Sequence, residues 1–374
     1  MLELLPILAL TLIHFGVPLT YYLYLKTVWF KKPWNIKRDP GYKPKVKVTV
    51  IIPTYNEVAF IESKLNDIAR QTYPRGLLEV IIVDSGSSDG TLDAVKRWVK
   101  AHDGFKLVTI KEDVRRGKAY ALNNALRYAN GDIIVVADAD STWLSHKTLE
   151  DVTSWFSDPT VGAVTCSKKP ESPGFTGIEE GYREFYNVIR VSESKAWSTP
   201  IFHGELAAFR RELLEKVGGF PEDIGADDSH TATLITLQGY RSIAADNIWC
   251  SEPVPREGYH KWRIRRAQHL IQHFIKTLKH VAKAPRAFKP ILVIESYLHL
   301  VNPWLLPAST TILIHQTLKG SITAIVLIAL GLALLVYKPF RTWITTQLYL
   351  IVATLRNIYT REITWEKQLK QTTV

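Results

Sequence analysis

Cysteine is nearly absent from this 374-residue chain, which contains only Cys166 and Cys250. Because no C-x-x-C motif is present, the sequence argues against both a disulfide framework and a cysteine-based zinc site. The middle of the chain, residues 45–257, also lacks any apolar run long enough to cross a membrane. Long apolar runs occur only near the two ends, so we expect one soluble domain between membrane segments.

The chain carries a formal net charge of +11. Its Lys and Arg residues crowd beside the apolar segments, where they would meet anionic lipid headgroups on the cytoplasmic side of a membrane. We therefore expect a membrane partner and no nucleic acid.

The first apolar stretch, Leu4 to Leu25, has His14 as its one side chain that titrates near neutral pH. It reaches the length of about 20 residues that a spanning helix needs. A cleaved signal peptide would begin with basic residues, whereas this chain has Glu3 and no small-residue cleavage site. We predict a transmembrane helix within residues 1–30. The basic residues that follow it place the next segment in the cytoplasm, and they are Lys26, Lys31, Lys32, Lys37 and Arg38.

Two more apolar stretches, Ile291 to Leu318 and Gly320 to Tyr337, predict a transmembrane helical hairpin over residues 289–338. Basic residues flank both of its ends, so both should be cytoplasmic. The last apolar stretch, Trp343 to Tyr359, is short and interrupted by Thr and Gln. This pattern favours an interfacial helix within residues 339–374. A fourth transmembrane helix stays open as the alternative.

Residues 258–288 contain apolar side chains at three- and four-residue steps, with Lys and Arg between them. This pattern predicts an amphipathic helix lying on the membrane surface, and packing on the soluble domain is the alternative. The apolar members are Ile264, Leu270, Ile271, Phe274, Ile275, Leu278 and Val281.

Strand-like and helix-like runs alternate through residues 45–257. Such alternation predicts an α/β domain built from βαβ units around a mostly parallel sheet. The expected strands are Val46 to Pro53, Leu78 to Asp84, Phe105 to Ile110, Asp132 to Asp138, and Val161 to Ser167.

Polar motifs follow three of these strands at their carboxyl ends. They are Pro53-Thr-Tyr55-Asn56-Glu57, the Asp84 to Gly90 segment, and Asp138-Ala-Asp140. The carboxyl ends of parallel strands share one rim, where ligands bind in open α/β sheets. Two of the motifs also fit simple helix starts. Together, the three motifs indicate a metal-assisted site for a phosphorylated ligand.

Asp138 and Asp140 are two residues apart, a spacing that puts both carboxylates on the same face of an extended chain. Hard oxygen ligands of this kind suit Mg²⁺ or Mn²⁺, whose remaining positions diphosphate oxygens and water can fill. The alternative is an acidic strand end followed by a Ser141 cap.

Two other motifs open predicted helices. Arg115-Arg116-Gly117-Lys118 brings cations to a helix start, where free amides also favour phosphate. Asp227 and Asp228 lie at a second helix start, where one carboxylate can cap and the other can take a proton from a substrate hydroxyl. Capping by both is the alternative. His203, Gly204 and Glu205 interrupt an apolar run and are candidates for an acceptor pocket, although a lone His there is more often structural.

In order, these motifs resemble glycosyltransferase family 2, and particularly its cellulose-synthase-like membrane members, over roughly Val46 to Gln272. The resemblance implies the Rossmann-like GT-A fold, with archaeal-type mannosyltransferases of lipid-linked glycan assembly among the members it favours. It implies that Asp140 holds the metal. Ala226-Asp227-Asp228 looks like the family's T-E-D motif, which makes Asp228 the base. Donor contacts would come from Pro53, Tyr55, Glu57, Asp84, Lys118 and Asp138.

The segment Arg263-Ile-Arg265-Arg266-Ala267 resembles the family's Q-x-x-R-W region. By that likeness Arg266 would clamp the leaving diphosphate, for which a guanidinium fork is well suited. Ala267 stands where the tryptophan would be, and that tryptophan helps to hold the polymer in processive relatives. The chain also has too few apolar stretches for a long channel, so we expect addition of a single sugar.

The expected function is an inverting, metal-dependent hexosyltransferase, integral to the cell membrane with its catalytic domain in the cytoplasm. By analogy, GDP-mannose is favoured as donor over a UDP-sugar, and a lipid-linked or membrane-proximal glycan as acceptor, as in N-glycan biosynthesis. The alternatives are a polyprenyl-phosphate sugar synthase, a processive polysaccharide synthase, and a non-enzymatic membrane carrier or assembly subunit.

Overall fold

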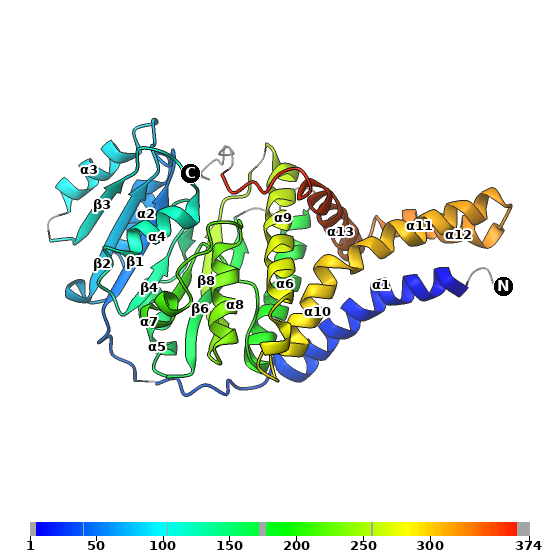
Figure 1. The fold of residues 1–374 in the computed structure, drawn as a ribbon, viewed down its shortest axis with the longest axis horizontal. Helices are drawn as coiled ribbons and strands as arrows, with labels where there is room; N and C mark the ends of the chain where they lie inside the picture. Colours follow the sequence, from blue (N-terminus) through cyan, green and yellow to red (C-terminus); the bar gives the residue numbers. More distant parts are fainter. Residues whose placement is uncertain (1–4, 40, 103, 172–176, 256, 365–374) are drawn as a thin grey trace.

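The computed structural model describes residues 5–39, 41–102, 104–171, 177–255 and 257–364. An α/β body occupies one end of the molecule, and an elongated helical arm made of α1, α11 and α12 projects from the other (Figure 1). Parts of two predicted segments lie outside the described residues, namely 1–4 and 365–374.

The described strands form one eight-stranded sheet in the order β3-β2-β1-β4-β7-β6-β8-β5. β1 pairs in parallel with β2 and β4, β2 with β3, and β6 with β8. β7 is antiparallel to β4 and β6, and β5 to β8. The sheet is therefore mostly parallel, as predicted. The strands are β1 Val48–Thr54, β2 Leu78–Asp84, β3 Leu107–Lys111, β4 Ile133–Val136, β5 Thr142–Trp143, β6 Val161–Pro170, β7 Ala207–Arg210 and β8 Arg241–Glu252.

Helices cover both faces of this sheet, because its central strands are apolar throughout and bury every second residue on each side. Val50 and Ile52 of β1 pack with α2, α3 and α5, whereas Ile51 packs on the opposite face with α4, α7 and α8. The helices are α2 Ile61–Ala69, α3 Thr91–Ala101, α4 Lys118–Leu126, α5 Thr148–Trp155, α7 Arg211–Lys216 and α8 Asp227–Leu237.

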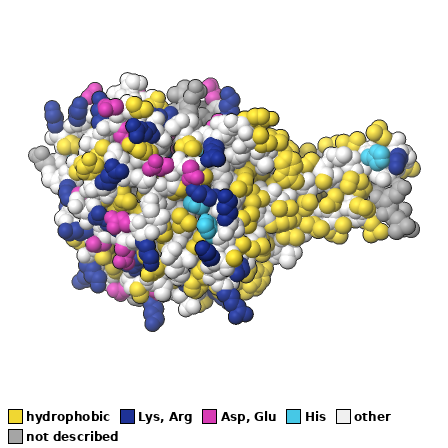
Figure 2. All heavy atoms as spheres, in the orientation of Figure 1, with side chains coloured by type: hydrophobic (Ala, Val, Ile, Leu, Met, Phe, Trp, Pro, Cys, Tyr) yellow, Lys and Arg dark blue, Asp and Glu magenta, His cyan; other side chains and the backbone are white. Residues whose placement is uncertain are grey.

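The N-terminal helix α1, Leu5–Tyr24, continues into a short π-helix, Leu25–Trp29, and the two together are long and apolar enough to cross a membrane. Among the described residues it is the one unbroken helix that meets this test, and up to three spans result if each bent helix pair counts as one. Hydrophobic side chains gather along the helical arm, whereas Lys and Arg gather on the α/β body (Figure 2).

The predicted hairpin contains a bend within its first apolar stretch. α10, Lys289–Leu300, meets α11, Asn302–Leu318, at 41°. Pro303 lies in the first turn of α11 and has no backbone N–H to continue the helix ladder from α10. α12, Ile322–Leu334, then meets α13, Lys338–Arg356, at 103°.

Two long helices, α6 Ile178–Ala196 and α9 Tyr259–Leu278, connect the body with this helical region. The predicted amphipathic stripe of α9 is divided between two environments. Ile271 and Phe274 are buried against α13 and α10, whereas Ile275 and Leu278 are exposed. The first pair therefore cannot face lipid, because the neighbouring helices already cover it.

Candidate active site

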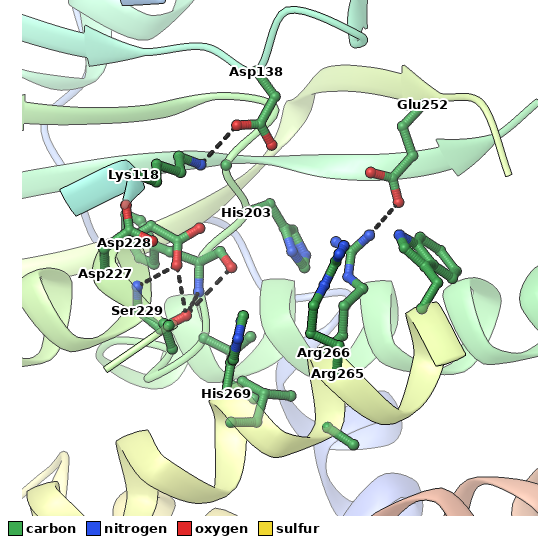
Figure 3. A pocket seen from close by; sticks show the side chains of 18 of the residues that line it. Lys118, Asp138, His203, Asp227, Asp228, Ser229, Glu252, Arg265, Arg266 and His269 are labelled. Carbon is green, nitrogen blue, oxygen red and sulfur yellow. Dashed lines mark hydrogen bonds and ion pairs between the residues drawn. The ribbon is translucent and has the colours of Figure 1, made fainter. Parts of the chain in front are cut away.

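A cavity opens at the carboxyl ends of β1 and β4, and its walls come from α6, α8, α9 and α13 (Figure 3). Most of the predicted site residues line it, although they come from widely separated parts of the sequence. They are Pro53, Tyr55, Glu57, Lys118, Asp138, Asp140, His203, Gly204, Asp227, Asp228 and Arg266.

Two predicted residues are buried and do not line this cavity. Asp84 accepts hydrogen bonds from the Thr54 hydroxyl at 3.0 Å and the Ser87 amide at 3.0 Å, so its carboxylate holds the turn after β2. Glu205 is 1% exposed and pairs with Lys168 and Arg266 behind the wall. Their predicted roles in donor and acceptor binding remain predictions.

Lys118 and Asp138 form an ion pair, with the ammonium nitrogen donating to Asp138 Oδ1 at 2.6 Å. Lys118 is the first residue of α4, which follows β3, and Asp138 follows β4. The pair therefore joins the connections after two strands that β2 and β1 separate in the sheet. Burial by itself would lower the pKa of Lys118, but the nearby carboxylates, Asp138 first, produce a net upward shift. Lys118 is therefore a fixed cation.

Gly204 allows this pair to form beside the β7 connection. A Cβ atom at Gly204 would lie 2.5 Å from the Lys118 nitrogen and 2.7 Å from Asp138 Oδ2. The Gly204 carbonyl also accepts a hydrogen bond from the Asp138 amide at 2.9 Å. Any side chain at this position would therefore force Lys118 or Asp138 to shift.

Asp227 and Asp228 are the first residues of α8 and face the same cavity (Figure 3). Burial and the adjacent Asp227 carboxylate raise the pKa of Asp228 to about 7. Burial also raises the pKa of Asp227, although Lys118 opposes the shift. A carboxylate that titrates near neutral pH is suited to accept a proton from a substrate.

Asp140 lines the cavity two residues after Asp138, as the D-x-D spacing requires. Asp138 is engaged with Lys118, and the assignment of Asp140 as the metal ligand stays a prediction. Within the described residues, no group of three His, Cys, Asp or Glu side chains forms a metal site by itself. The all-oxygen donor set nevertheless fits a hard divalent cation whose other ligands come from a diphosphate.

Arg266 lines the cavity but is also held by two carboxylates. Its guanidinium donates to Glu252 at 2.5 Å and to Glu205 at 3.4 Å. Arg265, the neighbouring residue on α9, faces the same cavity (Figure 3). Burial and the charge of Arg266 lower the pKa of Arg265 to about 10, so it is a desolvated cation near the Asp140 side of the site.

Sequence reasoning missed the contribution of α6 and α13 to the cavity wall. Tyr182, Tyr186 and Arg190 recur at four-residue steps, so they lie on one face of α6. This four-residue spacing was the sequence signal that could have identified them as one face of a helix. Tyr349 from α13 also lines the cavity. Trp262 of α9, which comes before Ala267 in the chain, lines it as well.

Comparison with known proteins agrees with this geometry. The family model described as Glycosyl transferase family 2 matches residues 49–218. A solved structure, mannosyltransferase PcManGT from Pyrobaculum calidifontis in complex with GDP-Man and Mn2+, is 54% identical with a TM-score of 0.88, covering 96% of this chain and 99% of that one. The chain belongs to glycosyltransferase family 2.

Two curated relatives are more distant. Probable glycosyltransferase YdaM of Bacillus subtilis (strain 168) is 28% identical over 67% of this chain and 63% of that protein. Poly-beta-1,6-N-acetyl-D-glucosamine synthase of Staphylococcus aureus (strain COL) is 26% identical over 72% of this chain and 68% of that protein. The chain thus spans less than two thirds of the first relative. The predicted GT-A fold and glycosyltransferase class are confirmed.

Proposed function

We propose that this member of glycosyltransferase family 2 transfers a single mannose from GDP-mannose to a membrane-proximal acceptor, with inversion at the anomeric carbon. The observation that carries the proposal is that the Lys118–Asp138 ion pair, Asp140 and the Asp227–Asp228 pair line one cavity at the strand ends. GDP-mannose is favoured over a UDP-sugar because the 54%-identical structure from Pyrobaculum calidifontis holds GDP-Man and Mn2+.

The donor would lie along the rim formed by β1 and β4. Tyr55 offers an aromatic ring whose one face already carries the Arg115 guanidinium, 3.9 Å from the ring centroid. Arg115 and Lys118 then bring two cations near the position of the diphosphate. Asp140 would hold Mg²⁺ or Mn²⁺ together with diphosphate oxygens, and the bound cation supplies neutralisation of the leaving group.

Asp228 would act as the base. Its carboxylate takes the proton of an acceptor hydroxyl while that oxygen forms a bond to the anomeric carbon. The bond from this carbon to the diphosphate oxygen breaks, and its electron pair leaves with GDP. Lys118 and Arg265 stabilise the charge that develops on the diphosphate. An α-linked donor then gives a β-linked product.

Membrane attachment belongs to the same proposal. The helix from Leu5 to Trp29 would span the bilayer, and the basic residues after it would keep the catalytic domain, residues 45–257, in the cytoplasm. Segment 258–288, hairpin 289–338 and the C-terminal region 339–374 would place the cavity at the membrane surface, within reach of a lipid-linked acceptor.

Transfer of radiolabelled sugar tests the proposal directly. The full-length protein in detergent is given a panel of GDP- and UDP-sugars, membrane lipid extract, and either Mn²⁺ or a chelator. The expected result is metal-dependent labelling from GDP-mannose. Labelling from a UDP-sugar alone would reject the assigned donor, and undiminished labelling in chelator would reject the role of the cation.

A further inference from the structure

The wall of the cavity between α6 and α9 is built largely from arginine side chains, and no step of the proposed reaction uses it. Arg183 of α6 lines the cavity there, together with Arg263 and Arg266 of α9. Glu252, which pairs with Arg266, is the carboxylate that lines the cavity beside them (Figure 3). Guanidinium groups therefore outnumber carboxylates on this side of the cavity.

The ion pairs of this wall leave one positive charge uncompensated. Within the described part of the chain, shared carboxylates join four cations into one network, but only three carboxylates take part. The cations are Lys168, Arg183, Arg263 and Arg266, and the carboxylates are Glu179, Glu205 and Glu252. Arg190 also lines the cavity, but it belongs to a separate set with Glu193 and Glu295. The network is therefore cationic.

Solvent screens little of this surplus, because the network is buried. The side chains of Lys168, Arg183 and Arg263 are at most 6% exposed, and those of the three glutamates at most 5%. Burial and the Glu252 carboxylate raise the pKa of Glu205, so uptake of a proton there would only increase the surplus. An uncompensated buried charge is costly, whereas an anion bound against the wall would compensate it.

Arg263 has the geometry of an anion-binding side chain. Its guanidinium lies 3.8 Å from the centroid of the Tyr182 ring and 5.8 Å from that of Tyr349, so aromatic rings fix its plane. A guanidinium has five N–H donors, and within the described residues that of Arg263 makes one hydrogen bond, to Glu179 at 3.2 Å. A fixed planar fork with spare donors matches the oxygens of a phosphoryl group.

The wall lies close to one end of the spanning helix. Tyr186 comes one turn after Arg183 on α6 and also lines the cavity. It packs in one cluster with Tyr21 and Leu25, where α1 meets the π-helix. In the proposed orientation this end of the helix lies at the cytoplasmic headgroup level, where the phosphates of membrane lipids also lie. A phosphoryl group attached to a lipid can therefore reach the wall without leaving the membrane surface.

We propose that the wall between α6 and α9 binds a phosphoryl group that joins the lipid of the acceptor to its glycan. The inference rests on the proposed function and defines the acceptor as a lipid-linked sugar phosphate. The donor diphosphate has its own cations at the other end of the cavity, where Arg115, Lys118 and Arg265 line it. The surplus between α6 and α9 is thus left for a second anion, whose attached sugar would extend toward Asp228 in the same cavity.

The charge of the labelled lipid product tests the inference. The full-length protein in detergent receives GDP-[¹⁴C]mannose, Mn²⁺ and membrane lipid extract, and the labelled lipids are separated on an anion-exchange column. We expect the labelled lipid to be retained, and mild acid, which cleaves sugar phosphates, to release an uncharged labelled glycan. Labelled lipid that passes the column unretained, or that yields no uncharged glycan after acid, overturns the inference.

Use of the donor distinguishes this failure from failure of the proposed function. If GDP-mannose labels an uncharged lipid, the donor assignment stands and only the phosphoryl site falls. If GDP-mannose labels no lipid while another nucleotide-sugar does, the proposed donor is wrong, and the charge of the lipid labelled by that other sugar still decides the inference.

Binding of a matched pair of probes tests the wall itself. One probe is a decyl hexoside, and the other carries a phosphoryl group between the same chain and sugar. Arg183→Gln leaves three cations for three carboxylates, so calorimetry should show the phosphorylated probe bound about tenfold more weakly, which corresponds to about 1.4 kcal/mol. Binding of the hexoside and of GDP should not change. Arg263→Lys keeps the charge without the planar fork and should weaken the phosphorylated probe by a smaller factor.

The control and a free-ion probe complete this measurement. Arg97→Gln, at an exposed arginine of α3 outside the cavity, should leave the binding of both probes unchanged. An Arg183→Gln protein that binds the phosphorylated probe as tightly as the parent contradicts the assignment, as does an equal loss of both probes. Inorganic phosphate that binds the parent as tightly as the phosphorylated probe would indicate a site for a free ion, which also overturns the inference.

Discussion

The two ends of the cavity use similar charged side chains but balance them differently. At the donor end, four carboxylates line the cavity together with Lys118, which pairs with Asp138. They are Asp138, Asp140, Asp227 and Asp228. At the other end, between α6 and α9, Arg183 and Arg263 share one buried carboxylate, Glu179, and Arg183 also lies near Glu252. The surplus of carboxylates lies where a metal cation and a proton would be bound. At the other end cations are in surplus, because four cations share three carboxylates. The cations are Lys168, Arg183, Arg263 and Arg266, and the carboxylates are Glu179, Glu205 and Glu252.

The largest expected effect comes from removing the base at the donor end. Asp228→Asn keeps the shape of the side chain but cannot accept the proton, so transfer should fall by about 10²- to 10⁴-fold. Steady-state transfer from GDP-mannose measures it. Asp223→Asn, at an acidic residue outside the cavity that pairs with Lys276, is the control. Full transfer by Asp228→Asn would exclude it as the base.

Substitution of Lys118 should have the next largest effect on activity, because Lys118 is the fixed cation of the donor end. Lys118→Met removes the charge that pairs with Asp138 and would face the diphosphate, so we expect a KM for GDP-mannose raised by about 10-fold, equivalent to about 1.4 kcal/mol. Donor titration by calorimetry checks the same loss at equilibrium. Lys111→Met, at the exposed end of β3, serves as the control. An unchanged KM would remove Lys118 from the donor site.

A methyl group at Gly204 should disturb the donor end without removing any charge. Gly204→Ala places a carbon within contact distance of both members of the Lys118–Asp138 pair, which must then separate. We expect a several-fold loss of kcat/KM, together with a loss of folding stability of about 1–3 kcal/mol for an overpacked site. If the Gly204→Ala enzyme were as active as the parent, the close approach would have no functional value.

Arg265 and Arg266 are neighbours on α9, but they face different ends of the cavity. Arg265 lies near Asp140 at the donor end, whereas Arg266 pairs with Glu205 and Glu252. Arg266→Gln leaves Glu252 and Glu205 short of a cation, so it should lower Tm, with an effect limited to about 1–3 kcal/mol because Arg266 is partly exposed. Arg265→Gln should leave Tm nearly unchanged and weaken binding of GDP. Thermal unfolding and GDP titration of both variants decide the assignment, and the reverse pattern would contradict it.

Much of the donor end was predictable from sequence because each motif directly follows a strand. β1 lies between β2 and β4, so the turns after Thr54, Asp84 and Val136 share one rim. The wall of the cavity between α6 and α9 was not predictable in this way. Its pairs join residues such as Arg263 and Glu179, which lie far apart in the chain and become neighbours only when α9 packs against α6.

The same reasoning explains two features that the sequence did not show. The predicted role of Arg266 at the diphosphate stays a prediction, but nothing in the local sequence shows that Glu252 of β8 also pairs with it. Ile271 and Phe274 were expected on a membrane-facing stripe, because periodicity identifies an apolar face but not whether lipid or another helix covers it.

The pH dependence of mannose transfer tests the central claim most directly. Asp228 must be ionised to accept a proton and its pKa is raised to about 7, so kcat/KM for transfer to a hexoside should fall as pH decreases through that value. Donor binding should change less over the same range, and Asp228→Asn should abolish the transition. A flat profile, or the same transition in Asp228→Asn, would contradict the account.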